Sequence, residues 1–338
     1  MVNFGKTLLI QCNFSKIYHF LSLFAIANPS NRRNFAYHNH NRQNMEQPRL
    51  DAIYNMVCNT PKGAELSIDY MPESFEHDDM DNDSPHVHTF YEIIWFREGG
   101  GTHTVDFQEY PIEKNTLFFL APGQVHFFDR ATAHKGILIK FCTDFLKEEH
   151  TDEDIYIKYN LFNAFNSRPC CTISEETAQR LLFVLHKLEE EQLNRNLIGH
   201  VDMLRSYTKI FLILIHRYCE KNGDTPLDAA KPSHRLFLQF RKTLERHYTR
   251  MHTVKEYADC LNVSAKTLSN SVIESTGKAP LAFINDRTTL EAKRLVRFSN
   301  MMIKEIADCL GFEDTSYFVK FFKRQTGYLP SAFREGRG

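Results

Sequence analysis

The chain has 338 residues, of which 42% are hydrophobic and 25% are charged, and its formal net charge is −1. This length predicts two to three domains with ample hydrophobic core. Its eight cysteines are scattered without Cys-x-x-Cys spacing, which fits a reducing compartment. The chain contains no Gly-rich phosphate loop and no nucleophile elbow, so the usual signals for P-loop nucleotide hydrolysis and for serine-hydrolase chemistry are absent.

The first 44 residues differ from the rest of the chain. They hold five Lys and Arg, eight Asn and no acidic residue. The apolar stretch from Leu21 to Ala27 weakly resembles the end of a signal peptide, but polar residues interrupt the segment before it. It is also too interrupted to span a membrane. We expect residues 1–44 to be a disordered arm or an upstream start, with folding beginning near Met45.

Residues 45–165 are expected to form a small β-barrel or sandwich. Short apolar runs alternate with turn signals such as Gly99-Gly100-Gly101 and Pro122-Gly123, and evenly spaced short strands are typical of these folds. The expected strands cover residues 90–96, 103–107, 116–120 and 136–141.

Four polar residues of this segment form a spaced pattern. His86 and His88 are followed by Glu92, and His126 comes later, after a turn. The pattern resembles the metal site of cupins, and alternate strand residues such as His86 and His88 can share one barrel interior. We expect the four side chains to line or brace a pocket for a small molecule, without a bound metal. The alternative is that three imidazoles and a carboxylate hold iron, manganese, nickel or zinc.

Residues 166–221 are expected to form a helical hairpin. Ser174 opens a run with apolar residues at helical spacing from Leu181 to Leu188, and a second run extends from Val201 to Ile215. The apolar faces would either cover the open side of the barrel or form a dimer interface, and the sequence does not decide between them. Residues 222–234 contain Gly and Pro and are the expected linker.

Two stretches in the last third of the chain repeat each other. Residues 255–261 read Lys-Glu-Tyr-Ala-Asp-Cys-Leu, residues 304–310 read Lys-Glu-Ile-Ala-Asp-Cys-Leu, and each is followed later by Thr-Gly-x-x-Pro. The copies are 49 residues apart at the first block and 50 at the last, so the second has one extra residue near Glu313. Each copy predicts two helices joined by a short turn, which matches the helix-turn-helix motif. A helical solenoid is disfavoured, because there are two copies with a long segment between them.

Capping residues mark the helices of both copies. Asn300 and Asp314 are expected to cap the two helices of the second copy, and Ser264 the second helix of the first. Gly311 and Asn262 follow the first helices, where a left-handed residue ends a helix. The expected apolar positions of the second helices are Leu268, Val272 and Ile273 in the first copy and Tyr317, Phe318, Phe321 and Phe322 in the second.

A single helix from Leu281 to Phe298, preceded by Pro280, is expected to hold the copies at a fixed separation. Adjacent major grooves on one face of DNA lie about 34 Å apart, so a rigid connector could present both second helices to one duplex. Residues 231–338 hold 19 Lys and Arg against 11 Asp and Glu, whereas the remaining residues hold 22 against 31. A basic domain gains affinity for nucleic acid by releasing counterions from phosphate.

Particular motifs accompany this pattern. The second copy contains Ile306-Ala307, Gly311-Phe312, Ser316-Tyr317-Phe318, Phe321-Phe322-Lys323-Arg324 and Thr326-Gly327, and the linking helix contains Glu291-Ala292-Lys293-Arg294-Leu295. From residue 235 to residue 335 the chain strongly resembles the AraC family of bacterial transcription regulators. In that family two helix-turn-helix units place recognition helices in successive major grooves, the sensor domain is a cupin-like barrel, and hairpin helices often mediate dimerisation.

The resemblance implies particular DNA contacts. Asn pairs with adenine, Lys reaches guanine, Ser and Thr serve either, and Val contacts the thymine methyl group. One departure weakens the expected grip of the first unit, because Glu274 stands where the family commonly has basic residues and would repel phosphate. The implied base-facing positions are Lys266, Ser269 and Asn270 in the first unit and Thr315, Ser316, Val319 and Lys320 in the second, with Lys323 and Arg324 as further DNA contacts.

The expected architecture is α+β and multidomain. It combines a cupin-like barrel over residues 45–165, a helical hairpin over 166–221, and an all-α double helix-turn-helix domain over 235–336. The resemblance implies a cytoplasmic, sequence-specific transcription regulator that is not an enzyme and is more usually an activator. Its expected partners are promoter DNA, RNA polymerase, a second copy of the chain, and a small-molecule effector such as a sugar or related metabolite, with no membrane and no cofactor. The alternative is a metal-dependent cupin enzyme with an appended DNA-binding domain.

Overall fold

The computed structural model describes residues 57–58, 66–71, 85–129, 134–142, 145, 161–162, 168–221 and 231–336. The expectation for residues 1–44 and most of the expected linker, residues 222–230, lie outside these ranges. Among the helices within them, none combines the length and the apolar character that a membrane crossing requires.

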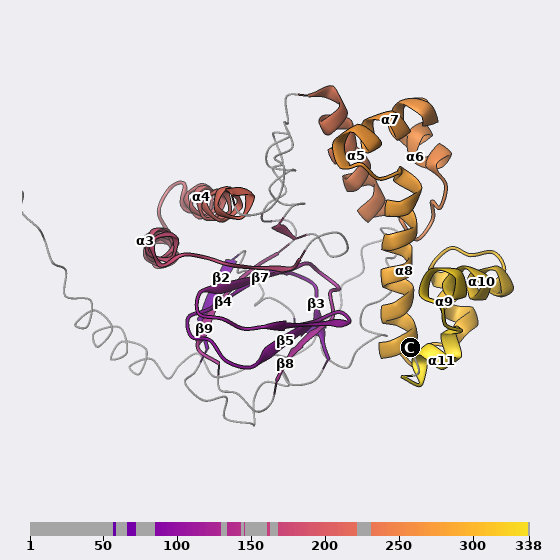
Figure 1. The fold of residues 1–338 in the computed structure, drawn as a ribbon. Coiled ribbons are helices and arrows are strands. Elements are labelled where there is room, and N and C mark those ends of the chain that lie inside the picture. Colours follow the sequence, from indigo (N-terminus) through magenta and orange to yellow (C-terminus); the bar gives the residue numbers. More distant parts are fainter. Residues whose placement is uncertain are drawn as a thin grey trace, which may run out of the picture. The chain divides into compact units, whose positions relative to one another are not determined.

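Two antiparallel sheets form the first part of the described chain (Figure 1). The larger sheet has the strand order β10-β7-β4-β9-β2, the smaller one has the order β6-β5-β8, and β1 pairs with β3 in parallel. Strands β7 and β9 span the residues expected from the sequence, and β4 and β5 start or end within two residues of them. The strands are β1 Val57–Cys58, β2 Leu66–Tyr70, β3 Val87–His88, β4 Tyr91–Phe96, β5 Thr102–Val105, β6 Gln108–Pro111, β7 Thr116–Leu120, β8 His126–Phe128, β9 Gly136–Phe141 and β10 Cys170–Thr172.

Alternation along the central strands divides the larger sheet into two faces. On β4, Ile93 and Trp95 belong to one hydrophobic core, whereas Ile94 and Phe96 belong to another. Strand β7 divides in the same way, with Leu117 and Phe119 on the first face and Phe118 and Leu120 on the second. Because successive strand residues point to opposite faces, a fully buried strand of this kind needs apolar cover on both sides.

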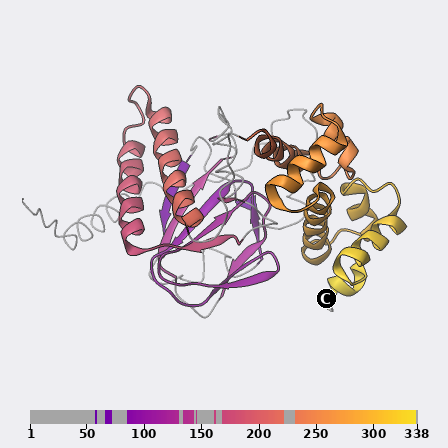
Figure 2. The same cartoon turned by 45° about the horizontal axis from the view of Figure 1, so that its top comes forward.

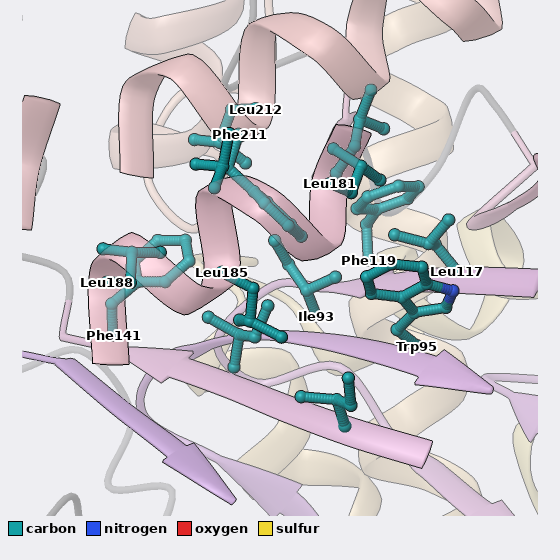
Figure 3. Close-up of a cluster of buried hydrophobic side chains, with 14 of the residues drawn as sticks. Ile93, Trp95, Leu117, Phe119, Phe141, Leu181, Leu185, Leu188, Phe211 and Leu212 are labelled. Carbon is teal, nitrogen blue, oxygen red and sulfur yellow. The ribbon is translucent and has the colours of Figure 1, made fainter. Parts of the chain in front are cut away.

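A helical hairpin supplies the cover on the first face. Helices α3 (Glu175–Gln192) and α4 (His200–Lys221) lie beside each other in both ribbon views (Figures 1 and 2). Figure 3 shows Leu181, Leu185 and Phe211 of the hairpin directed toward Ile93 and Trp95 of the sheet. Ser174, which was expected to open this run, caps α3, since its hydroxyl accepts a hydrogen bond from the backbone N–H of Thr177. The hairpin therefore covers the sheet, and its role as a dimer interface stays a prediction.

The last part of the described chain is helical and contains the repeat. Helix α5 begins at Pro232, so three residues of the expected linker belong to a helix, with Pro at a position where its missing N–H costs nothing. The extra residue of the second copy lies between α9 and α10, as expected from the spacing. The helices are α5 Pro232–His247, α6 Val254–Cys260, α7 Ala265–Thr276, α8 Pro280–Phe298, α9 Ile303–Cys309, α10 Thr315–Thr326 and α11 Pro330–Arg334.

The expected caps of the second helices are confirmed, and one other is wrong. Ser264 accepts from the N–H of Thr267, and Asp314 accepts from the first turn of α10. Asn300 does not cap α9, because that helix begins later, at Ile303, and its N-terminal Met302 N–H donates to the Glu305 carboxylate instead.

Two residues expected on apolar faces lie at the surface. Ile273 is 47% exposed and Tyr317 is 55% exposed. In α7 the buried positions Leu268 and Val272 are four residues apart, and Ile273 is turned one position farther around the helix.

Helix α8 links two separate hydrophobic cores (Figure 1). Near its start, Phe283 and Ile284 pack with residues of α5, α6 and α7. Near its end, Leu295 and Val296 pack with residues of α9, α10 and α11. Tyr248, just after α5, packs against both cores. The two helix-turn-helix units are therefore joined by shared packing as well as by the chain.

A buried ion-pair network lies between these cores. Arg287 donates to Glu245 of α5 and to Glu291 of α8 at 3.0 Å each, and Arg294 donates to Glu291 at 3.3 Å. The Arg287 guanidinium also stacks over the Tyr248 ring, 3.7 Å from its centre. Burial works against the charged form, but Tyr248 and the two carboxylates outweigh it and raise the pKa of Arg287 well above its ordinary value. The network therefore fixes α8 against α5.

The turn of the second unit makes a close contact with the first. Gly311 has a φ of +75°, and Asn262 occupies the equivalent turn of the first unit at +56°, which confirms their expected roles. A Cβ atom added to Gly311 would lie 2.2 Å from the backbone carbonyl oxygen of Thr249, in the segment that follows α5. The ring of Phe312 also stacks on His252, with their centroids 4.8 Å apart. Glycine at position 311 is thus required by the approach of the two units.

We predict that Gly311→Ala destabilises the chain far more than Gly277→Ala does. Gly277 has a similar φ of +71° but open space around it, so alanine there suffers only the left-handed backbone penalty of about 1–2 kcal/mol. At position 311 the clash with Thr249 should add at least about 2 kcal/mol. Urea unfolding of both full-length variants, followed by circular dichroism, measures the difference. Equal losses would show that the two units do not meet at this turn.

Candidate DNA-reading surface and barrel histidine cluster

The residues that the resemblance marked as DNA-facing lie on helices α7 and α10. Lys266 and Asn270 are exposed on α7 and Ser269 is half-buried beside them. On α10, Ser316, Lys320, Lys323 and Arg324 are exposed, and Thr315 and Val319 are half-buried. Val319 also packs against the core of the second unit. The structure brings each set onto one helix, and their base contacts stay a prediction.

The two recognition helices differ in charge. The 50-residue spacing of the repeat makes Ile273 and Glu274 the counterparts of Lys323 and Arg324. All four side chains are exposed. The last turn of α10 therefore presents two cations where α7 presents an apolar and an acidic side chain. Because phosphate contacts supply much of the affinity for DNA, the second unit should grip the backbone more tightly.

The length of α8 suits two sites on one duplex. Its 19 residues span about 28 Å at 1.5 Å per residue. This is close to the repeat of about 34 Å between major grooves on one face of B-DNA. Since α8 packs into both units, their separation is set by a regular helix rather than by a loop.

A second group of polar side chains is buried among the strands. Glu92 lies on β4, His88 on β3, His126 at the start of β8 and His103 on β5, and each is at most 4% exposed. The His88 Nε2 atom lies 3.1 Å from the Glu92 Oε2 atom, and the His126 Nε2 atom lies 3.9 Å from it. The ring of His86 lies against that of His126, with centroids 4.2 Å apart. The structure thus brings together all four residues of the expected pocket.

His103 is a further member that the sequence pattern did not identify. Its Nε2 atom lies 3.1 Å from the Nδ1 atom of His126, and its ring stacks on Phe128. The residue was placed on an expected strand, but nothing in its spacing relates it to His126. The connection arises because β5 pairs with β8, which places His103 opposite Phe128. The pairing of β5 with β8 could not be inferred from the spacing of the histidines in the sequence.

Burial and mutual repulsion determine the charges in this cluster. Burial, followed by the neighbouring imidazoles, lowers the pKa values of His103 and His126 well below 6.5, so both are neutral at pH 7. Burial alone would raise the pKa of Glu92, but the charge and hydrogen bond of His88 outweigh it and lower the pKa. Glu92 is therefore an anion in a buried group that includes two neutral imidazoles, those of His103 and His126.

The cluster has donor atoms of the kind that hold metal ions. One ligand atom each from His88, Glu92 and His126 lie within 4.8 Å of one another, and all three residues are buried. The Nδ1 atom of His88 faces the carbonyl oxygen of Phe90 at 3.0 Å, which is the outer hydrogen bond that metal-binding histidines commonly make. His126 Nε2 has no hydrogen-bond partner within the described residues. The donor set therefore fits a three-ligand metal site, although His88 and Glu92 also satisfy each other directly.

Comparison with known proteins matches both parts of the chain. Residues 74–195 match the model of an AraC-like ligand binding domain, and residues 257–336 match that of a helix-turn-helix domain. The HTH-type transcriptional activator RhaS of Escherichia fergusonii is 24% identical, and the similarity covers 75% of this chain and 87% of that protein. The HTH-type transcriptional activator RhaR of Cronobacter sakazakii is 23% identical with the same coverage.

Among solved structures, ToxT from Vibrio cholerae is similar at 15% identity, with 80% of this chain and 98% of that chain covered and a TM-score of 0.36. A sheet domain of ligand-binding type followed by two helix-turn-helix units defines a DNA-binding transcription regulator. The chain carries both domains of an AraC-type regulator, and it is similar over three quarters of its length to the activators RhaS and RhaR.

We predict that the stability of the sheet domain falls as the pH decreases from 7.5 to 5.5. His103 and His126 have lowered pKa values in the folded chain, so the unfolded chain binds more protons below pH 6.5. Each of the two should reduce stability by up to about 1.4 kcal/mol per pH unit. Glu92 acts in the same direction at lower pH, because its pKa is also lowered. Melting temperatures of wild type, His103→Gln and the exposed control His186→Gln check this; an unchanged slope in His103→Gln would contradict the assignment.

We also predict that Glu274→Arg strengthens DNA binding and its dependence on salt. An arginine at this exposed position of α7 would add about one phosphate contact, which steepens the log–log salt slope by about 0.9. Fluorescence anisotropy with one duplex over a range of salt concentrations measures the slope. Glu176→Arg on α3 makes the same charge change far along the chain and should leave the slope unaltered. If both variants behave alike, α7 does not lie against the phosphate backbone.

Proposed function

We propose that this regulator reads a promoter site with α7 and α10 together and that a small molecule bound in the sheet domain controls its activity. The observation that carries the proposal is the placement of two exposed polar helix faces by one rigid connector, α8. Lys266 and Asn270 are offered by the first helix and Ser316 and Lys320 by the second. Because the two units differ in sequence, the site they read should be asymmetric or composed of two unlike half-sites.

The buried cluster supports the second half of the proposal. Glu92, His88, His103 and His126 place hydrogen-bonding groups in the interior of the sheet domain, where unsatisfied polar atoms are costly. The Nδ1 atom of His103 and the Nε2 atom of His126 have no hydrogen-bond partner within the described residues. A hydroxyl-bearing molecule, such as a sugar or related metabolite, would satisfy both. Binding would shift the population of DNA-competent forms only if the molecule binds those forms more tightly.

Activation is the proposed outcome of DNA binding. The supporting observation is that the relatives RhaS and RhaR are HTH-type transcriptional activators. Contact with RNA polymerase stays a prediction, and a transcription assay with purified polymerase tests it: added regulator should increase transcript from the selected promoter, and a decrease would indicate repression.

We predict that Lys320→Ala weakens specific DNA binding by about 1–3 kcal/mol. Lys320 is exposed in the middle of α10, where a side chain can reach a base edge. Fragments selected from the host genome by the purified chain supply the site, and gel shifts give the affinities. Lys304→Ala removes an equal charge from α9 of the same unit and serves as the control. Equal losses for specific and random DNA would assign Lys320 to phosphate rather than to a base.

We expect the purified chain to contain metal well below one equivalent. The His88–Glu92 pair already satisfies two of the three donor groups, so the cluster is stable without a cation. Elemental analysis after dialysis measures the content in wild type and in His88→Ala. One tightly held equivalent that is lost in the variant would instead favour the alternative, a metal-dependent cupin enzyme with an appended DNA-binding domain.

A further inference from the structure

Two cysteines from distant segments meet beside the larger sheet. Cys171 is the middle residue of β10, and Cys219 lies near the end of α4, 48 residues later. Their Sγ atoms are 2.6 Å apart, with the Cys219 thiol donating a hydrogen bond to the Cys171 sulfur. Both are free and half-buried. A sheet strand and a packed helix therefore hold two thiols at a separation only about 0.5 Å longer than a disulfide bond.

The neighbouring Cys170 belongs to the other side of the strand. Cys170 packs in the core on the second face of the sheet, whereas Cys171 packs against the core beneath the hairpin. This division follows from strand alternation, because β10 pairs with β7 and Cys171 lies opposite Leu117. The adjacent cysteines thus point apart, and the partner of Cys171 comes from α4.

We propose that Cys171 and Cys219 form a redox-sensitive pair, which an oxidant of the peroxide class closes into a disulfide that ties the end of α4 to the sheet. The Cys219 sulfur attacks one peroxide oxygen and releases water, which leaves a sulfenic acid. The Cys171 sulfur then displaces the sulfenic oxygen as a second water. Two thiols lose two electrons and two protons, and hydrogen peroxide takes them up as two water molecules.

The surroundings of the two thiols determine how readily the disulfide forms. The hydrogen bond from Cys219, together with burial, raises the pKa of the Cys171 thiol far above its ordinary value. Cys171 is therefore a protonated, slow thiol, and the pair stays reduced in a thiol-rich compartment. Closure needs sustained exposure to oxidant rather than a brief pulse.

The position of the pair in the fold determines which segment the disulfide would restrain. Strand β10 is at the edge of the larger sheet, and α4 ends at Lys221, shortly before α5 begins at Pro232. A disulfide at Cys219 would anchor the last turn of α4, where the chain leaves the sheet domain for the DNA-binding domain. Any effect of this anchor on transcription rests on the proposed function, but the bond itself does not.

The test treats the reduced, full-length chain with hydrogen peroxide, alkylates the remaining thiols and maps linked peptides by mass spectrometry without reductant. The expected result is a loss of two of the eight thiols, one peptide pair joining Cys171 to Cys219, and recovery of both thiols with dithiothreitol. Hydrogen exchange in the last turn of α4 should slow on oxidation. None of these measurements involves DNA, so their failure is distinct from failure of the proposed function.

Matched variants distinguish a disulfide between Cys171 and Cys219 from general oxidation of the cysteines. Cys142→Ser and Cys170→Ser should still lose two thiols, whereas Cys219→Ser and Cys219→Ala should lose none to an intramolecular bond. Two substitutions at Cys219 guard against a folding defect in one of them, and circular dichroism confirms the fold of each. The proposal is overturned if all eight thiols survive oxidation, if other cysteines are linked instead, or if Cys171 and Cys219 are converted to sulfinic acids without joining.

Discussion

The buried contact of Arg287 with Glu245, Glu291 and Tyr248 is the interaction on which the arrangement of the two helix-turn-helix units depends. The three partners of Arg287 come from different segments. Glu245 belongs to α5, Tyr248 to the segment after α5 that packs against both cores, and Glu291 to α8 itself. A buried ion pair contributes little net stability over an apolar replacement, but removing one partner leaves an uncompensated charge. The network therefore acts mainly on geometry, because it disfavours any packing of α8 that separates these groups.

The repeat was predictable from the sequence because its signals are local. Helix caps such as Ser264 and Asp314, and left-handed turn residues such as Asn262 and Gly311, act within a few residues of themselves, so spacing alone identifies them. The wrong prediction at Asn300 also came from a local signal. Asn is a good capping residue, but the helix begins three residues later, at Ile303. Nothing local shows that Gly311 meets Thr249 or that Tyr248 bridges the cores. Those features arise only when segments distant in sequence pack together.

In the sheet domain, too, local features were predictable from the sequence and contacts between distant segments were not. Strand positions were predictable from apolar runs and turns, and the pattern of His86, His88, Glu92 and His126 was visible as spacing. His103 was not, because its place in the cluster is set by the pairing of β5 with β8. The charge state of the cluster likewise depends on burial and on neighbours from four strands. In the proposed effector site, a buried anion near the neutral imidazoles of His103 and His126 would discriminate strongly among ligands, since a bound molecule would have to match fixed donors and acceptors without help from water.

In the proposed complex, one rigid helix, α8, presents two unlike helix-turn-helix units to successive turns of a single duplex. Binding affinity measured on a series of selected sites, in which base pairs are inserted between the two half-sites, tests it most directly. We expect that inserting about five base pairs, half a helical turn, abolishes the contribution of the second half-site, because α8 cannot follow the rotation of the groove. An affinity that does not change on this insertion would show that the two units bind independently and that α8 does not fix their separation on DNA.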